Sequence, residues 1–248
     1  MADPASTQTR VLLTGAAGRI GTAFVAEYGD RYRFRLADKP GAVMDAPGPH
    51  EVIAFDIADL RAFRAACDGI DVVVHLAADP SPEADFYGSL LNNNILGTFN
   101  AFRAAKDAGC LRLIFASSVH AVMGYSPENP VPDGAPVKPM NFYGATKTWG
   151  ESLAHAFAYS EGLSSIAIRI GAYDAPWIRE HPSDDNLSAY ISARDLNQLI
   201  MRAIETPDVQ FAIVHGISNN RIKRLDLAET IRLLGYAPQD DGFALAGL

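Results

Sequence analysis

The chain has 248 residues, a formal net charge of −8 and 48% hydrophobic residues. The excess of acidic residues argues against a partner that is nucleic acid or an anionic membrane, because both require a basic surface. The hydrophobic content excludes a disordered chain, and the length suits one large domain.

Signals for membranes, disulfides and metals are weak. Residues 1–9 are polar and lack the apolar centre of a signal peptide, and no apolar run approaches the roughly 18 residues of a membrane span. Cys67 and Cys110 are too few for a disulfide scaffold or a zinc site built on thiolates. We therefore expect a cytoplasmic protein without a bound metal.

Strand and helix patterns alternate along the chain. The predicted strands are 11–13, 33–37, 52–55, 71–76, 111–116, 165–170 and 211–214. The predicted helices are 19–28, 86–108 (with a local break near Gly88 or Gly97), 143–162 and 226–234. This alternation predicts an α/β fold of Rossmann type, a doubly wound parallel sheet whose ligands bind beyond the carboxyl ends of the strands.

A glycine turn follows the first predicted strand. Gly15, Gly18 and Gly21 have the spacing G-x-x-G-x-x-G, and Arg19 and Ile20 lie inside the motif. The first glycine permits the tight turn, the second lets the backbone approach a pyrophosphate, and the third lets the helix pack on the sheet. With a strand before it and a helix after it, this motif predicts a dinucleotide site.

Residues at the ends of the next strands favour NAD as the dinucleotide. Asp38 ends the second strand, where a carboxylate binds the ribose hydroxyls of NAD and repels the 2′-phosphate of NADP. Lys39 follows it directly, so NADP remains the less favoured alternative. Asp56 and Ile57 end the third strand, beside the expected adenine ring. Small residues at 76–78 (Leu76, Ala77 and Ala78) end the fourth strand and permit close approach of the cofactor.

A tyrosine and a lysine form the predicted catalytic pair. Tyr143 and Lys147 are four residues apart on a predicted helix, so they share one face. A free tyrosine has a pKa of about 10, and a nearby positive charge stabilises its phenolate. Tyr143 can then accept the proton of a substrate hydroxyl while a hydride leaves the same carbon. Ser118, at the end of the fifth strand, is the expected group that polarises the reacting oxygen.

Several motifs together resemble one enzyme family. They are His75-Leu76-Ala77-Ala78, Asn94-Ile95-Leu96-Gly97-Thr98, Ser117-Ser118, the Tyr143/Lys147 pair and Arg169-Ile170-Gly171. They resemble the extended short-chain dehydrogenases/reductases, the branch of NAD-dependent epimerases and dehydratases, and within it most closely the uronate dehydrogenases. The resemblance implies that Asn94 belongs to the catalytic group, that Ile170 borders the cofactor and that His120 lies close to substrate.

The resemblance is less complete around the substrate. Uronate dehydrogenases, which oxidise a hexuronate at C1 to a lactone, carry Asn and Ser where this chain has Val119 and Ala172. A sugar acid would need a cation, for which Arg179 is the candidate. Arg194 is the second candidate, and its alternative role is that of a structural partner for Asp195 or a helix end.

The expected organisation is one NAD(P)-binding domain over residues 1–248. Segments 172–192 and 215–248 would form a small substrate cap, which suits a small molecule better than a nucleotide sugar. The expected activity is NAD-dependent oxidation of a small sugar or sugar acid. The alternatives are an epimerase or dehydratase that retains its NAD, and a dinucleotide sensor without catalysis. The resemblance also implies a homo-oligomer, formed through the helix that carries Tyr143.

Overall fold

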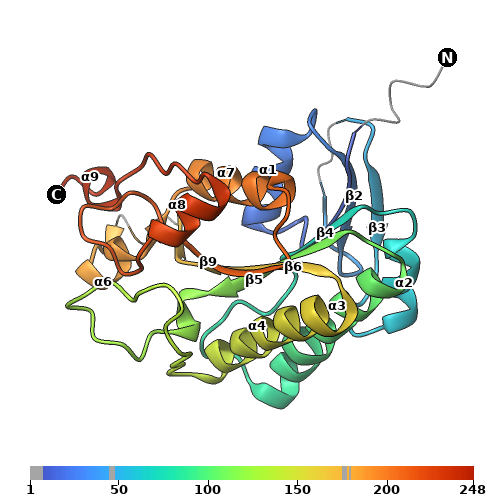
Figure 1. Cartoon of the computed structure of the whole chain (residues 1–248), viewed down its shortest axis with the longest axis horizontal. Coiled ribbons are helices and arrows are strands. Elements are labelled where there is room, and N and C mark those ends of the chain that lie inside the picture. The colour runs from blue at the N-terminus through green and yellow to red at the C-terminus, as the bar shows by residue number, and fades with distance from the viewer. Residues whose placement is uncertain (1–7, 45–47, 175–177, 179) are drawn as a thin grey trace.

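The computed structural model describes residues 8–44, 48–174, 178 and 180–248, and its centre is a parallel sheet (Figure 1). Within these ranges seven strands lie in the order β3-β2-β1-β4-β5-β6-β9. They are β1 (Arg10–Thr14), β2 (Arg33–Asp38), β3 (Glu51–Ala54), β4 (Val72–His75), β5 (Arg112–Ser118), β6 (Ser164–Ile170) and β9 (Phe211–Gly216). The order reverses between β1 and β4, which places a crevice at their carboxyl ends. The predicted Rossmann-type fold is confirmed.

Helices cover both faces of this sheet (Figure 1). One face carries α2 (Leu60–Cys67), α3 (Gly97–Asp107) and α4 (Phe142–Glu161); the other carries α1 (Arg19–Tyr28), α7 (Ala193–Glu205) and α8 (Ala228–Leu234). In the described ranges, no helix is both long enough and apolar enough to cross a membrane.

The structure differs from the sequence prediction in several elements. The helix expected at 86–108 divides at Gly97, one of the two predicted break points, but its first segment, η2 (Phe86–Leu96), is π-helical, which was not predicted, and α3 follows from Gly97. β5 continues to Ser118, beyond the predicted end at Ala116. Short elements without a clear periodic signal were not predicted: α6 (Asp184–Ser188), α9 (Gly242–Leu245), the 3₁₀ turn η3 (Val119–Ala121) and the parallel pair β7 (Ala172–Tyr173) and β8 (Tyr190–Ile191).

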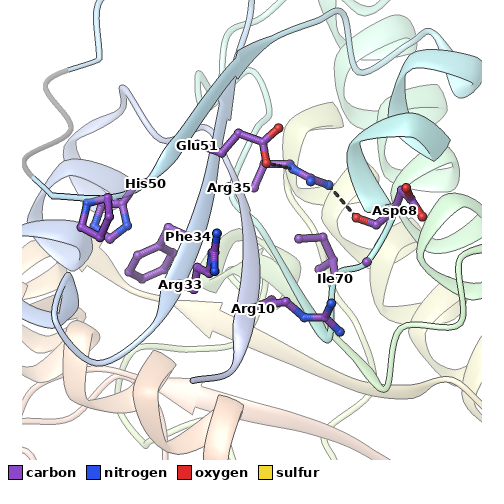
Figure 2. A pocket seen from close by; sticks show the side chains of 10 residues that line it. Arg10, Arg33, Phe34, Arg35, His50, Glu51, Asp68 and Ile70 are labelled. Atoms are coloured by element: carbon purple, nitrogen blue, oxygen red, sulfur yellow. Dashed lines mark hydrogen bonds and ion pairs between the residues drawn. The ribbon is translucent and has the colours of Figure 1, made fainter. Parts of the chain in front are cut away.

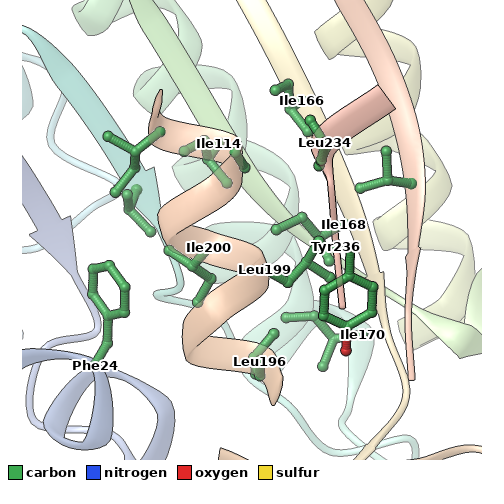
Figure 3. Close-up of a cluster of buried hydrophobic side chains, with 14 of the residues drawn as sticks. Phe24, Ile114, Ile166, Ile168, Ile170, Leu196, Leu199, Ile200, Leu234 and Tyr236 are labelled. Atoms are coloured by element: carbon green, nitrogen blue, oxygen red, sulfur yellow. The ribbon is translucent and has the colours of Figure 1, made fainter. Parts of the chain in front are cut away.

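The strands are apolar on both faces because each face has its own core. On one side, Leu196, Leu199 and Ile200 of α7 point toward Ile114 and Ile168 of the sheet (Figure 3). On the other side, a second cluster lies beneath α3 and α4 and contains Phe102, Phe115 and Phe157. Each fully buried side chain of this size contributes about 1.5–3 kcal/mol. The two cores fix the strand ends that carry the polar residues described below.

Candidate active site

The glycine turn between β1 and α1 is a tight backbone bend against the end of β4. Gly15 has φ +73°, and a Cβ there would lie 2.9 Å from the backbone nitrogen of Ala77. A Cβ on Gly21 would lie 2.6 Å from the carbonyl oxygen of Gly15. Gly18 precedes α1, and the first turn of this helix has no side-chain cap. The bend therefore presents backbone donors at a helix N-terminus, the arrangement that suits a pyrophosphate.

Asp38 holds this turn against the end of β2. Its Oδ2 accepts a hydrogen bond from the backbone nitrogen of Ala17 at 2.9 Å. Its Oδ1 accepts one from the backbone nitrogen of Lys39 at 2.8 Å. An ionised carboxylate has about four acceptor positions, so Asp38 retains capacity for the hydroxyls of a ribose.

The two residues inside the glycine motif have different surroundings. The guanidinium of Arg19 lies 5.0 Å from the ring centroid of Tyr173 and donates to the backbone carbonyls of Tyr173 and Asp174. Ile20 packs against the larger hydrophobic core. Arg19 therefore joins the glycine turn to the segment around β7.

The other predicted cofactor residues lie along the same carboxyl edge. The Oδ1 of Asp56 accepts a backbone hydrogen bond two residues further on, at 2.9 Å, which shapes the turn before α2. Ile57 packs so closely on Gly97 that a Cβ there would lie 2.7 Å from its Cδ1. Residues 76–78 follow β4 directly, and Ile170 ends β6. These positions border the crevice from β3 to β6.

The structure brings Ser118, Tyr143 and Lys147 together. Ser118 ends β5 and lies beside Tyr143, close enough for its hydroxyl to lower the pKa of the phenol. The Nζ of Lys147 lies 5.4 Å from the ring centroid of Tyr143 and 5.3 Å from that of Phe115. The three polar side chains are all buried.

Glycine and asparagine residues set the position of α4 over β5. The side chain of Asn141 caps the helix by accepting a hydrogen bond from the Gly144 nitrogen at 2.7 Å. A Cβ on Gly144 would lie 2.4 Å from the carbonyl oxygen of His120, and one on Gly150 would lie 2.2 Å from the ring of Phe115. Gly144 is therefore required for contact with the chain after β5, a reason that the sequence alone did not reveal.

Burial dominates the electrostatics of the pair. It lowers the pKa of Lys147 to about 8, because the ammonium group is removed from water. Burial also raises the pKa of Tyr143, while the Ser118 hydroxyl lowers it and the charge of Asp79 raises it. The expected lowering of the Tyr143 pKa thus comes in this structure from Ser118, and it is smaller than the opposing effect of burial.

Asn94 joins the loop after β4 to α4. Its Oδ1 accepts from the Asp79 nitrogen at 2.8 Å, and its Nδ2 donates to the Asp79 carbonyl at 3.0 Å and to Thr146 Oγ1 at 3.1 Å. Thr146 in turn donates to the carbonyl of Tyr143 at 2.7 Å. Asn94 therefore acts on the catalytic helix through Thr146.

Of the residues predicted to contact substrate, the structure places one beside Tyr143, pairs one with a carboxylate and does not describe the third. The ring of His120 lies edge-on to that of Tyr143 at 5.5 Å, its Nδ1 lies 3.1 Å from the Asn141 amide, and burial lowers its pKa. Arg179 lies outside the described residues. Arg194 forms an ion pair with Asp240 at 2.5 Å, rather than with its neighbour Asp195.

A buried polar network beneath the site was missed from the sequence. Glu151 and Arg169 form a two-bonded ion pair at 2.8 and 2.9 Å, with each side chain 3% exposed. Ser117 donates to the same carboxylate at 2.6 Å, and His215 lies 3.5 Å from the guanidinium. The available signal was Arg169 itself, because a charge in an otherwise apolar central strand needs a buried partner.

A hollow of about 590 Å³ lies at the opposite edge of the sheet, among the amino ends of β1, β2 and β3 (Figure 2). Two of its arginines have carboxylate partners: Arg10 pairs with Asp71 at 2.7 Å, and Arg35 pairs with Glu51 at 2.6 Å. Tyr143 is not among the residues that line this hollow. Across the described part of the chain, no three His, Cys, Asp or Glu side chains are grouped so as to hold a metal.

Comparisons with known proteins agree with this geometry. The chain is 37% identical to an NAD-dependent glucose-6-phosphate dehydrogenase of Haloferax volcanii, over 93% of each chain. It is 35% identical to a uronate dehydrogenase of Pseudomonas putida, over 93% of this chain and 84% of that protein. A mutant uronate dehydrogenase of Agrobacterium tumefaciens, solved in complex with NAD, superposes with a TM-score of 0.85 at 30% identity, covering 96% and 87% of the two chains.

The family assignment rests on a match that spans most of the chain. Residues 11–209 match the model of the NAD dependent epimerase/dehydratase family. This range includes the glycine turn, Ser118, Tyr143 and Lys147, and the resemblance inferred from the motifs is confirmed. The chain therefore belongs to the NAD dependent epimerase/dehydratase family.

Proposed function

We propose that this protein is an NAD-dependent dehydrogenase that oxidises a small sugar or sugar acid at C1 to the lactone. The observation that carries the proposal is the convergence of Ser118, Tyr143 and Lys147 in a buried position at the carboxyl edge of the sheet. The named activities of relatives at 34–37% identity support it, since they are NAD-dependent or NAD(P)-dependent oxidations of sugars and uronates.

The glycine turn fits NAD. The bend at Gly15 and the start of α1 would hold the pyrophosphate. The turn is this tight because Gly15 and Gly21 have no side chain, since any Cβ there would collide with the backbone. Asp38 would bind a ribose, and its negative charge disfavours the 2′-phosphate of NADP. Asp56, Ile57 and residues 76–78 would border the adenine side of the crevice, whereas Ile170 and Lys147 would border the nicotinamide side.

Tyr143 would act as the base. NAD, when bound, supplies the acceptor for the hydride that leaves C1. The Tyr143 phenolate accepts the proton of the C1 hydroxyl, so the carbon–oxygen bond gains double-bond character as the hydride departs. Ser118 donates a hydrogen bond to the same oxygen and orients it. Lys147 has a pKa of about 8, so it is still an ammonium at neutral pH, and its donors would reach the ribose of the nicotinamide.

The remaining predicted groups would shape the substrate side. Asn94 keeps α4 in place through Thr146, and His120 forms part of the wall beside Tyr143. Segments 172–192 and 215–248 would form the cap. They contact each other in the described part of the chain, since Asn220 donates to the carbonyl of Tyr190 at 2.9 Å. Arg179 remains the predicted partner of any substrate carboxylate.

We also propose that the protein is a cytoplasmic homo-oligomer. Exposed apolar side chains gather on neighbouring elements of the α4 side: Tyr87, Leu91, Leu96, Phe99, Met140, Phe142 and Trp149. A second copy would cover them, because apolar patches of this kind mark interfaces. The free cysteines Cys67 and Cys110 suit a reducing compartment. Sedimentation equilibrium tests the assembly, and the mass of a single chain would contradict it.

Net production of NADH tests the proposed activity. The purified protein is incubated with NAD and a panel of aldoses, hexuronates and sugar phosphates, and the absorbance of NADH is followed. We expect NADH to accumulate in proportion to the sugar lactone formed. A sugar that is changed without net NADH would favour an epimerase or dehydratase, and failure to bind NAD in calorimetry would contradict the cofactor assignment.

A further inference from the structure

The loop after β4 carries a carboxylate that the proposed reaction does not use. Asp79 follows the small residues 76–78 and is half-buried. Asn94 binds both its backbone nitrogen and its backbone carbonyl, at 2.8 and 3.0 Å. Its side chain is fixed as well: Oδ1 accepts from the Ser81 nitrogen at 3.0 Å, and Oδ2 accepts from the Ser89 hydroxyl. The carboxylate is therefore held in one position.

The π-helical winding of η2 explains how two side chains reach the same loop residue. Ser89 and Asn94 are five residues apart, and a π-helix has hydrogen bonds from each residue to the fifth one along. Both side chains consequently face the loop, one bonded to the carboxylate of Asp79 and the other to its backbone. Such windings recur at functional sites.

Asp79 is close to the catalytic helix. The amide of Asn94 bonds simultaneously to the Asp79 carbonyl and to Thr146, which is bonded to the backbone of Tyr143. The negative charge of Asp79 also raises the pKa of Tyr143, which agrees with this placement. The charge of Glu83, four residues after Asp79, raises the pKa of His120 and so opposes the effect of burial on that residue. The wall beside Tyr143 and His120 thus carries negative charge.

Apart from Lys147, which lies against the Tyr143 ring, three arginines at this end of the described structure are engaged by the protein itself. Arg19 donates to the carbonyls of Tyr173 and Asp174. Arg224 donates to carbonyls in the 123–126 loop, and Arg194 pairs with Asp240. An anionic sugar would meet Asp79 without an opposing charge from these three side chains.

We infer that Asp79 determines substrate class: its carboxylate accepts hydrogen bonds from the hydroxyls of a neutral aldose and disfavours sugar acids and sugar phosphates. This inference rests on the proposed function. A fixed carboxylate suits a hydroxyl-rich ligand, because charge-assisted hydrogen bonds are stronger than neutral ones. It repels a second anion, and the repulsion is stronger than between two fully hydrated groups because Asp79 is half-buried.

Matched substrates test the inference. The pairs are D-glucose and D-glucuronate, D-galactose and D-galacturonate, and D-glucose and glucose 6-phosphate, each with NAD and the purified protein. We expect kcat/KM for the aldose to exceed that for its anionic partner by about 10-fold or more. The Asp79→Asn variant should lose about 10-fold in kcat/KM for the aldose and should reduce the preference within each pair by a similar factor.

Asp85→Asn is the matched control. Asp85 caps η2 by accepting a hydrogen bond from the Gly88 nitrogen at 2.6 Å, and asparagine can do the same. The control removes one negative charge from the same region and should leave the preference within each pair unchanged. Thermal unfolding and NAD binding confirm that both variants are folded, so a changed preference cannot reflect loss of structure.

The outcomes separate this inference from the proposed function. If sugar acids or sugar phosphates are oxidised better than their aldoses, the proposed dehydrogenase stands and the inference about Asp79 is wrong. If Asp79→Asn slows both members of a pair equally, its role is structural and the inference is also wrong. If no sugar in the panel yields NADH, the proposed function fails and the inference falls with it.

Discussion

The two edges of the parallel sheet use charge in opposite ways. At the amino edge, Arg10 begins β1 and Arg35 lies in the first half of β2. Both pair with carboxylates near the surface. At the carboxyl edge, Lys147 is buried with no carboxylate partner among the described residues, and its ammonium lies against the rings of Phe115 and Tyr143. The comparison teaches that the hollow at the amino edge is lined by charges that are already paired, whereas the proposed site at the carboxyl edge contains a charge that is not. Reactivity is expected where a charge is both buried and unneutralised.

Removal of the phenol hydroxyl should give the largest effect. The Tyr143→Phe variant retains the ring that contacts His120 but lacks the proposed proton acceptor. We expect kcat to fall by about 10²–10⁴-fold, the usual contribution of a general base. NAD affinity, measured by calorimetry, should change little because the glycine turn is intact. Activity close to that of the unmodified protein would remove Tyr143 from its role.

The same substitution at both edges compares a buried ion pair with an exposed one. Glu151→Gln leaves Arg169 buried and uncompensated, and we expect a loss of about 3–5 kcal/mol in the free energy of unfolding. Glu51→Gln breaks the Arg35 pair, whose glutamate is 54% exposed, and should cost about 1 kcal/mol or less. Urea denaturation of the two variants checks this difference. Equal losses would show that the edges are energetically alike.

The pH dependence of stability should also differ at the carboxyl edge. The pKa of Lys147 is about 8 when folded and 10.5 when unfolded, so between these values the unfolded chain binds more protons. Stability due to this group therefore rises from pH 8 to 10.5. Lys147→Met, which lacks the buried charge, should be more stable below pH 8 by at most about 3 kcal/mol.

This stability advantage should disappear by about pH 10.5. Denaturation at pH 7 and at pH 10.5 measures it, with Lys106→Met on the same side of the sheet as the control. Lys106 is half-buried near the end of α3, and its substitution should show no comparable pH dependence. A difference between Lys147→Met and the unmodified protein that is constant with pH would contradict the buried-charge explanation.

The cofactor side could be predicted from the sequence because its signals are local. The strand, Gly15, Gly18 and the following helix lie within a short stretch, and Asp38 has a fixed place at the end of the next strand. The same holds for Tyr143 and Lys147, which are one helical turn apart. Their association with Ser118 followed from strand-end geometry, since parallel strands end at one edge.

The substrate side could not be predicted in the same way. Arg194 was weighed against its neighbour Asp195, yet its partner is Asp240, which is distant in the sequence. Glu151 and Arg169 meet only because α4 packs on β6. The role inferred for Asp79 depends on the π-helical winding of η2, whereas the sequence of this segment suggested an ordinary helix. These contacts are tertiary, and a single sequence carries little trace of them.

The missing side chain at Gly144 limits which parts of the protein can move. The start of α4 lies directly against the carbonyl of His120, so the helix and the chain after β5 shift only as a unit. The proposed reacting groups at the start of α4 and the end of β5 would therefore keep their mutual arrangement when a ligand binds.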